Sequence, residues 1–107
     1  MSQAVGGGSG AGDNVAIHGP VTIENSGEMR RTLHDALRAK SATVSVDLSN
    51  VSYMDTSGLA TLVEAVRIAR QQGTRLILGG MLDQPRYLFE ITQLDRLFEM
   101  AAPEAGK

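Results

Sequence analysis

The stretch from Val44 to Val66 limits what this chain can fold into more than any other. Its first residues, Val44 to Leu48, alternate apolar and polar side chains, which is typical of a β-strand with one buried face. A polar turn follows, and beyond it apolar residues recur at the three- and four-residue spacing of an amphipathic helix. Gly73 is placed to end this helix, and Glu64 can pair with Arg67 inside it. The stretch therefore predicts a strand, a turn and a helix in direct succession.

The residues before this stretch predict two strands and a helix. Apolar residues alternate on both sides of Gly19-Pro20, which is typical of two short strands joined by a tight turn. Asn25 and Glu28 have the spacing of a capping box at a helix start. Apolar residues then recur on one face of that helix, at Met29, Leu33, Ala36 and Leu37.

The residues after Gly73 predict a strand, a short helix and a last strand. Leu76-Ile77-Leu78 lacks alternation, as expected of a strand that is covered on both faces. Asp83 can cap the short helix, which has Pro85 in its first turn. The apolar positions of this helix are Tyr87, Leu88 and Ile91, and those of the last strand are Leu97, Phe98 and Met100.

The predicted order is β-β-α-β-α-β-α-β. Strands that alternate with helices indicate an α/β fold, with a mostly parallel mixed sheet of four to five strands and helices packed on it. The 107 residues suffice for one such domain, which we expect over residues 14–101. Residues 1–13 are rich in glycine and predict a disordered tail, and residues 102–107 predict a frayed C-terminus.

Composition argues against several classes of function. The chain has no cysteine, which excludes disulfides, thiolate catalysis and zinc–thiolate sites. Its net charge is −2 and its basic residues are scattered, which argues against a nucleic-acid partner. The two histidines, His18 and His34, lack the spacing of a metal site. The apolar runs are far shorter than the ~20 residues of a membrane span, and the N-terminus lacks the pattern of a signal peptide. We therefore expect a cytoplasmic protein without metal, cofactor or membrane insertion.

The start of the central helix carries the residues with the most chemical potential. Asp55, Thr56 and Ser57 lie where backbone N–H groups lack intrahelical partners and where the helix dipole favours an anion. The sequence around Ser57 is not the Gly-x-Ser-x-Gly element of a hydrolase, and a single Asp-Thr-Ser-Gly element cannot supply the two aspartates of an aspartic protease. No phosphate-binding glycine loop with a lysine is present either. These patterns predict no catalytic residue.

The segment DLSNVSYMDTSGLATL, from Asp47 to Leu62, resembles the signature of STAS domains, the fold shared by bacterial anti-sigma-factor antagonists and the tails of sulfate transporters. The resemblance extends from about Val15 to Met100 and is strongest from Val46 to Leu62. In such antagonists, a partner kinase phosphorylates a serine in an Asp-Ser/Thr-Ser-Gly element. The resemblance therefore implies that Ser57 is a phosphoacceptor.

The neighbours of Ser57 each have two interpretations. Thr56 is either a helix-start residue or a secondary phosphorylated hydroxyl. Asp55 caps the helix, orients the Ser57 hydroxyl toward a kinase, or does both. Gly58 either lets a partner approach the backbone or accommodates the turn.

The resemblance also implies a partner surface. An aspartate similar to Asp47 lies near the kinase contact in the family, although a solvated turn residue would look the same. The residues expected to contact the partner are Asp47, Asp55, Gly58 and Leu59.

The resemblance implies a binding protein that is not an enzyme. Its partner would be an anti-sigma factor that is also an ATP-dependent serine kinase, bound through the surface around Ser57 and the helix from Leu59 to Gln71. Phosphorylation would break the complex, and a phosphatase would restore it. The alternative with the same fold is a cytoplasmic subunit that docks on the ATPase of a lipid-trafficking ABC transporter. The sequence predicts no particular oligomeric state.

Overall fold

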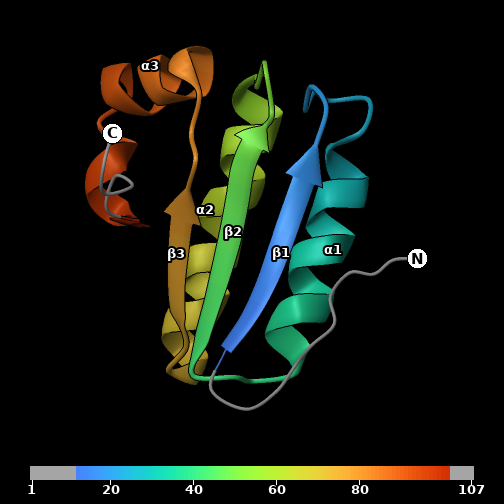
Figure 1. The fold of residues 1–107 in the computed structure, drawn as a ribbon, viewed down its shortest axis with the longest axis vertical. Coiled ribbons are helices and arrows are strands. Elements are labelled where there is room, and N and C mark those ends of the chain that lie inside the picture. Colours follow the sequence, from blue (N-terminus) through green and yellow to red (C-terminus); the bar gives the residue numbers. More distant parts are fainter. Residues whose placement is uncertain (1–11, 102–107) are drawn as a thin grey trace.

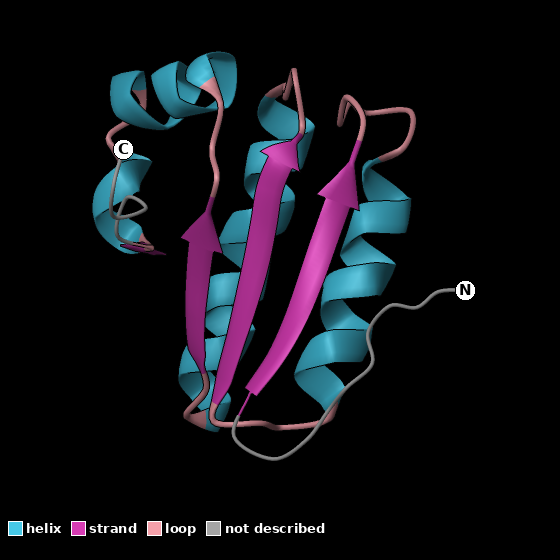
Figure 2. Ribbon diagram, in the orientation of Figure 1, coloured by secondary structure: helices cyan, strands magenta, loops and turns pink. Residues whose placement is uncertain are grey.

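The computed structural model describes residues 12–101, which form a layer of parallel strands with two long helices against one of its faces (Figures 1 and 2). The strands are β1 (Gly12–His18), β2 (Thr43–Asn50), β3 (Arg75–Gly79) and β4 (Glu99–Met100). The helices are α1 (Ser26–Arg38), α2 (Thr56–Gln72) and α3 (Asp83–Ile91), and the short 3₁₀ helix η1 (Leu94–Leu97) follows α3. The alternation of strands and helices confirms the predicted α/β class.

The sheet has the strand order β1-β2-β3-β4, and all neighbouring strands are parallel. Val15, Val46 and Leu78 lie side by side across its three longer strands. Helices α1 and α2 lie against the same face, behind the strands in Figure 1. The loops that enter α1, α2 and α3 all lie at the carboxyl ends of the strands, at the top of the picture.

The core lies between that face and the two helices. Val44, Val46 and Leu48 of β2 are at most 1% exposed, which confirms the alternation predicted for this strand. The core residues that the helices contribute are Met29, Leu33 and Leu37 from α1, and Leu59, Leu62, Ala65, Val66 and Ala69 from α2.

The prediction of two opening strands is wrong. The chain leaves β1 at His18, turns through Gly19 with φ +79°, and forms only one parallel bridge, between Val21 and Met54. The N–H and carbonyl of Val21 are engaged by Tyr53 and Asp55, so the segment pairs with the turn after β2 and not with β1. Among residues 12–101, the sheet consequently has four strands and is wholly parallel rather than mixed.

The prediction that β3 is covered on both faces is also wrong. Leu76 and Leu78 point to the helices and are buried, whereas Ile77 points to the opposite face and is only partly buried. That face has no helix over it in Figure 1, and Ile77 lines a hollow there together with Ser45 and Asp47. The apolar run of β3 thus consists of two leucines that face the core and one isoleucine, Ile77, that lies among polar residues on the open face.

Two of the predicted helix-end signals, Asn25 and Asp83, act differently in the structure. Asn25 precedes α1 but does not cap it, because its side chain accepts from the backbone N–H of Thr22 and donates to the carbonyl of Pro20. Asp83 lies inside the first turn of α3 and makes no cap hydrogen bond. Gly73 ends α2 in the left-handed conformation with φ +80°, as predicted.

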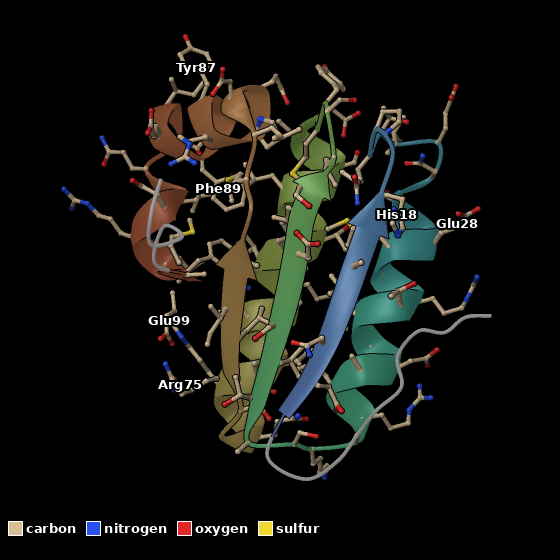
Figure 3. The ribbon with its side chains drawn as sticks, in the orientation of Figure 1. His18, Glu28, Arg75, Tyr87, Phe89 and Glu99 are labelled. Atoms are coloured by element: carbon tan, nitrogen blue, oxygen red, sulfur yellow. The ribbon has the colours of Figure 1, made fainter. Side chains whose placement is uncertain are left out.

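Of the apolar positions predicted for α3, only Leu88 packs against the core, and it is partly buried. Pro85 and Phe89 are its buried residues, whereas Tyr87 and Ile91 are 62% and 57% exposed. Figure 3 shows Tyr87 pointing away from the molecule and Phe89 pointing into it. The Phe89 ring packs on that of Phe98, with ring centroids 5.2 Å apart. Phe98 therefore joins α3 to the last strand.

The predicted ends of the chain need two corrections. Gly12 and Asp13 belong to β1 rather than to a tail, and Asp13 accepts a hydrogen bond of 2.8 Å from the Ser41 hydroxyl. Leu97 belongs to η1, so the last strand is only Glu99–Met100. The rest of the predicted tail, residues 1–11, and the predicted frayed end, residues 102–107, lie outside the described residues.

Replacement of a core leucine tests this packing. We expect Leu62→Ala to lower the free energy of unfolding by about 2–5 kcal/mol, because Leu62 is fully buried between α2 and the sheet and its loss leaves a cavity. Urea denaturation measures the change. Gln71→Ala, at an exposed position of the same helix, should change it by less than about 0.5 kcal/mol. Equal effects of the two substitutions would contradict the described core.

Candidate functional site

Asp55 starts the central helix. Its backbone is extended, and its Oδ1 accepts hydrogen bonds from the N–H groups of Ser57, at 2.9 Å, and Gly58, at 3.3 Å. These are two of the N–H groups that a helix start leaves without intrahelical partners. The predicted cap by Asp55 is therefore confirmed.

The second carboxylate oxygen of Asp55 joins this helix start to the β1–α1 loop. Oδ2 accepts from the backbone N–H of Ile23 at 3.1 Å. Two backbone hydrogen bonds reinforce the link, from Val21 N–H to the Tyr53 carbonyl at 2.9 Å and from Asp55 N–H to the Val21 carbonyl at 3.0 Å. These three hydrogen bonds connect the β1–α1 loop to the turn between β2 and α2 at the carboxyl edge of the sheet.

Helix α3 holds the same turn from the other side. The Gln84 amide accepts from the backbone N–H of Met54 at 2.8 Å and donates to the Met54 carbonyl at 3.0 Å. It thus supplies both hydrogen bonds that a neighbouring strand would give to Met54, whose side chain is fully buried. Sequence reasoning missed Gln84, because its partner lies 30 residues away and no local pattern marks it.

Gly58 is required by close packing inside the molecule. A Cβ atom at this position would lie 2.7 Å from Cγ of Met54 and 2.9 Å from Cγ1 of Val21. Both distances are too short for carbon atoms to adopt without movement of the neighbours. The buried glycine lets α2 begin directly against the bridge between Val21 and Met54.

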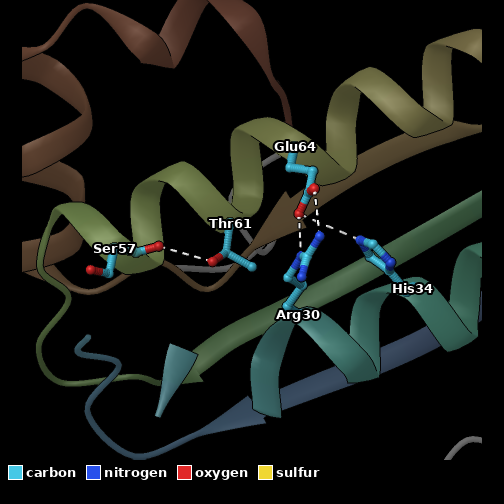
Figure 4. A network of polar contacts seen from close by, with 5 residues as sticks. All are labelled: Arg30, His34, Ser57, Thr61 and Glu64. Atoms are coloured by element: carbon cyan, nitrogen blue, oxygen red, sulfur yellow. Dashed lines mark hydrogen bonds and ion pairs between the residues drawn. The ribbon is translucent and has the colours of Figure 1, made fainter. Parts of the chain in front are cut away.

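Ser57 is the second residue of α2 and is half-buried. Its backbone is fixed twice, because its N–H donates to Asp55 and its carbonyl accepts from the Thr61 hydroxyl at 2.9 Å (Figure 4). Its own hydroxyl makes no hydrogen bond to any residue between 12 and 101. The preceding hydroxyl, on Thr56, is exposed. The Ser57 hydroxyl, which lacks a hydrogen bond among these residues and lies on a backbone fixed at both its N–H and its carbonyl, is chemically a suitable acceptor for a transferred group.

The expected partner-binding residues do not all meet at one place. Asp55, Gly58 and Leu59 lie together at the start of α2, but Leu59 is only 5% exposed. Asp47 lies on the open face of β2, where its Oδ1 accepts from the Ser49 N–H at 3.0 Å. A Cβ at Gly80 would lie 2.9 Å from the same Oδ1. Asp47 is thus fixed beside the β3–α3 loop.

Glu64 joins the two long helices. Its carboxylate accepts two hydrogen bonds from the Arg30 guanidinium, at 2.7 and 3.0 Å, and lies 3.5 Å from Nε2 of His34 (Figure 4). The hydrogen bond from Arg30 lowers the pKa of Glu64 below its ordinary value, and Coulombic attraction by Arg30 and His34 acts in the same direction. The predicted pair of Glu64 with Arg67 is wrong, because α1 brings Arg30 closer.

Residues 12–101 lack the features of a metal site and of a membrane-spanning helix. They contain no group of three or more His, Asp or Glu residues that could hold a metal ion. None of their helices is long and apolar enough to cross a membrane. His18 is exposed at the end of β1 (Figure 3), and His34 is partly buried and contacts Glu64 of the neighbouring helix α2.

Comparison with known proteins identifies the class to which this fold and helix start belong. The model of the STAS domain family matches residues 13–105, so the chain belongs to the STAS domain family. The anti-sigma-B factor antagonist of Listeria monocytogenes is 30% identical over 87 residues, which cover 81% of this chain and 76% of that protein. The anti-sigma-B factor antagonist of Bacillus subtilis is 29% identical over 92 residues, which cover 86% and 84%.

Solved structures agree on the fold. The anti-sigma factor antagonist SpoIIAA in its unphosphorylated form has a TM-score of 0.69 at 16% identity, and the match covers 94% of this chain and 88% of that one. SpoIIAA from Bacillus in the phosphorylated form has a TM-score of 0.68 at 17% identity, over 92% and 90%. The resemblance found in the sequence is therefore confirmed for the family and the fold.

A methyl group at Gly58 tests the packing of the turn. We expect Gly58→Ala to lower the free energy of unfolding by about 1–3 kcal/mol, because the added Cβ overlaps Met54 and Val21. Urea denaturation measures the change. The matched control is Gly27→Ala in α1, where a Cβ meets nothing within 4 Å. This control should be unchanged or more stable by up to about 1 kcal/mol. A Gly58→Ala protein as stable as the control would contradict the close contact.

Removal of the Gln84 amide tests the support from α3. We expect Gln84→Ala to cost about 1–3 kcal/mol and to speed hydrogen exchange at the Met54 amide, because the backbone of Met54 loses both partners. Glu90→Ala, at an exposed position of the same helix, should change stability by less than about 0.5 kcal/mol. Unchanged exchange at Met54 in the Gln84 variant would show that the amide does not hold the turn.

Proposed function

We propose that this chain is an anti-sigma-factor antagonist whose binding to its partner is switched off by phosphorylation of Ser57. Membership of the STAS family and two relatives that are anti-sigma-B factor antagonists support the role. One observation carries the choice of residue. Ser57 presents a half-buried hydroxyl without a hydrogen bond among residues 12–101, on a helix start that Asp55 and Gln84 hold in place.

In this proposal the partner is an anti-sigma factor with ATP-dependent serine kinase activity. The unphosphorylated chain binds it through the surface around Ser57 and so frees the sigma factor. The kinase transfers the γ-phosphoryl group of ATP to the Ser57 hydroxyl, whose proton is released, and ADP leaves. A phosphatase later hydrolyses the phosphate ester and restores the binding form. Thr56, exposed beside Ser57, is the alternative acceptor hydroxyl, which the Ser57→Ala variant tests.

Electrostatics explain why phosphate would disrupt the contact. Phosphorylation adds about −1.5 to −2 charges at neutral pH. The N–H groups of Ser57 and Gly58, which could bind that charge, already donate to the Asp55 carboxylate. The new phosphate would therefore lie beside an existing carboxylate and face the partner. A partner surface that fits one negative charge here loses affinity when the second is added.

The other expected contact residues divide into two roles in this proposal. Asp47 is exposed and can contact the partner directly. Gly58 and Leu59 are buried, so they act by holding the start of α2 in position. Asp55 does both, since its carboxylate caps the helix and is only half-buried.

Phosphorylation in vitro tests the proposal. The purified chain is incubated with ATP and, in turn, with each purified host anti-sigma factor that has a kinase-like ATPase domain. Intact-mass spectrometry and fragment mapping then locate any phosphate. We expect a single phosphate on Ser57, none on Ser57→Ala, and unchanged modification of Thr56→Ala, because the acceptor is Ser57 rather than its exposed neighbour.

Binding of the same anti-sigma factor is then measured by calorimetry. Ser57→Ala should bind as the wild type does, and the phosphorylated chain should bind at least about tenfold more weakly. A chain that is never phosphorylated and instead co-purifies with the ATPase of an ABC transporter would overturn the proposal in favour of a transporter subunit.

A further inference from the structure

A groove runs along α2 from the helix start that carries Ser57. It lies between the exposed flank of α2 and the first residue of η1. Its floor is apolar, with Leu59, Ala60 and Val63 on one side and Leu94 on the other. Thr56 lines it at one end, and Glu64 and Arg67 line it at the other. We call this surface the α2–η1 groove.

The turn after α3 creates the groove. Helix α3 ends at Ile91, and Gln93 adopts the left-handed conformation with φ +61°. This reversal of the chain places Leu94 against α2, where it is partly buried. Ile91, three residues earlier, is 57% exposed. Leu94 is thus the apolar side chain that the α3–η1 segment contributes to the groove.

The spacing of the lining residues defines the length of the groove. Thr56, Ala60, Val63 and Arg67 follow one another at steps of three and four residues, so they form a single stripe on α2. At about 1.5 Å per residue, the stripe is on the order of 16 Å long, or three helical turns. That length matches the apolar face of a short helix.

The charges at the far end of the groove are unequal. Arg30 already neutralises Glu64 through two hydrogen bonds. Arg67 is exposed and has no ion pair with any residue between 12 and 101. The far end therefore presents a cation, and an occupant with a carboxylate at that point is favoured.

The walls of the groove indicate the shape of its occupant. Both walls are helical, so their backbone groups are engaged within the helices and cannot pair with an added strand. An apolar floor with one charged end suits a helix that carries apolar residues on one face and an acidic residue near one end.

We propose that the α2–η1 groove docks an amphipathic α-helix of the anti-sigma factor, with a carboxylate of that helix against Arg67. The inference rests on the proposed function, since it names how that partner binds. The groove ends at Thr56, the neighbour of Ser57. Docking therefore brings the phosphoacceptor to the kinase in a fixed orientation.

Substitution of Ala60 tests the groove. Ala60 is exposed on its floor, so Ala60→Arg fills the groove without disturbing the core. The matched control is Ala39→Arg, which makes the same substitution at an exposed position just after α1, outside α2 and the groove. Calorimetry measures binding to the anti-sigma factor identified by the phosphorylation assay. We expect Ala60→Arg to weaken binding at least about tenfold and Ala39→Arg to change it less than about twofold.

Cross-linking identifies the occupant. A photoreactive amino acid at position 60 should capture a peptide of the anti-sigma factor with apolar residues at helical spacing and an acidic residue near one end. The same amino acid at position 39, exposed just after α1, should capture none. Capture of a second copy of this chain, or of a partner segment without that spacing, would overturn the inference.

The outcomes separate this inference from the function on which it rests. If the wild-type chain binds no anti-sigma factor, both fail. If the wild type binds and is phosphorylated on Ser57, and Ala60→Arg binds equally tightly, only the groove fails. Circular dichroism of the Ala60→Arg protein should match the wild type, so that lost binding is not lost folding.

Discussion

The carboxylate of Asp55 is the interaction on which the arrangement around Ser57 depends. One oxygen accepts from the N–H groups that begin α2, and the other accepts from Ile23 in the β1–α1 loop. An asparagine would offer a single oxygen, and its NH₂ group would face one of these donors. The position therefore requires two acceptor oxygens on one side chain. The same group starts a helix and joins two loops that are 32 residues apart in the chain.

Close packing also holds this turn on the side that faces the core. The main chain at Gly58 contacts Val21 and Met54 so closely that no side chain fits, and Gln84 satisfies the backbone of Met54 from α3. Two loops and helix α3 thus converge beneath one helix start. Asp55, Thr61 and Gln84 hold the backbone here through hydrogen bonds, whereas the Ser57 hydroxyl has no hydrogen-bond partner among residues 12–101. That pattern is expected where a reactive group must be presented at a fixed position.

Sequence reasoning succeeded where the determining interactions are local. The alternation of β2, the cap by Asp55 and the left-handed stop at Gly73 each depend on residues within a few positions of one another. It failed where a distant element competes for a group. Glu64 pairs with Arg30, 34 residues away, rather than with its neighbour on the helix.

The same explanation covers the other errors. Asn25 has the spacing of a helix cap, but the turn at Pro20 uses both ends of its amide. The exposure of Ile77 depends on which face of the sheet the helices cover, and that choice is made by the whole fold. In the proposed pathway, the acceptor hydroxyl lies in a turn whose helix cap, Asp55, is local, whereas the α2–η1 groove depends on how α3 and η1 fold back on α2. Two proteins with the same turn and different grooves would accept the same phosphoryl group and still bind different partners.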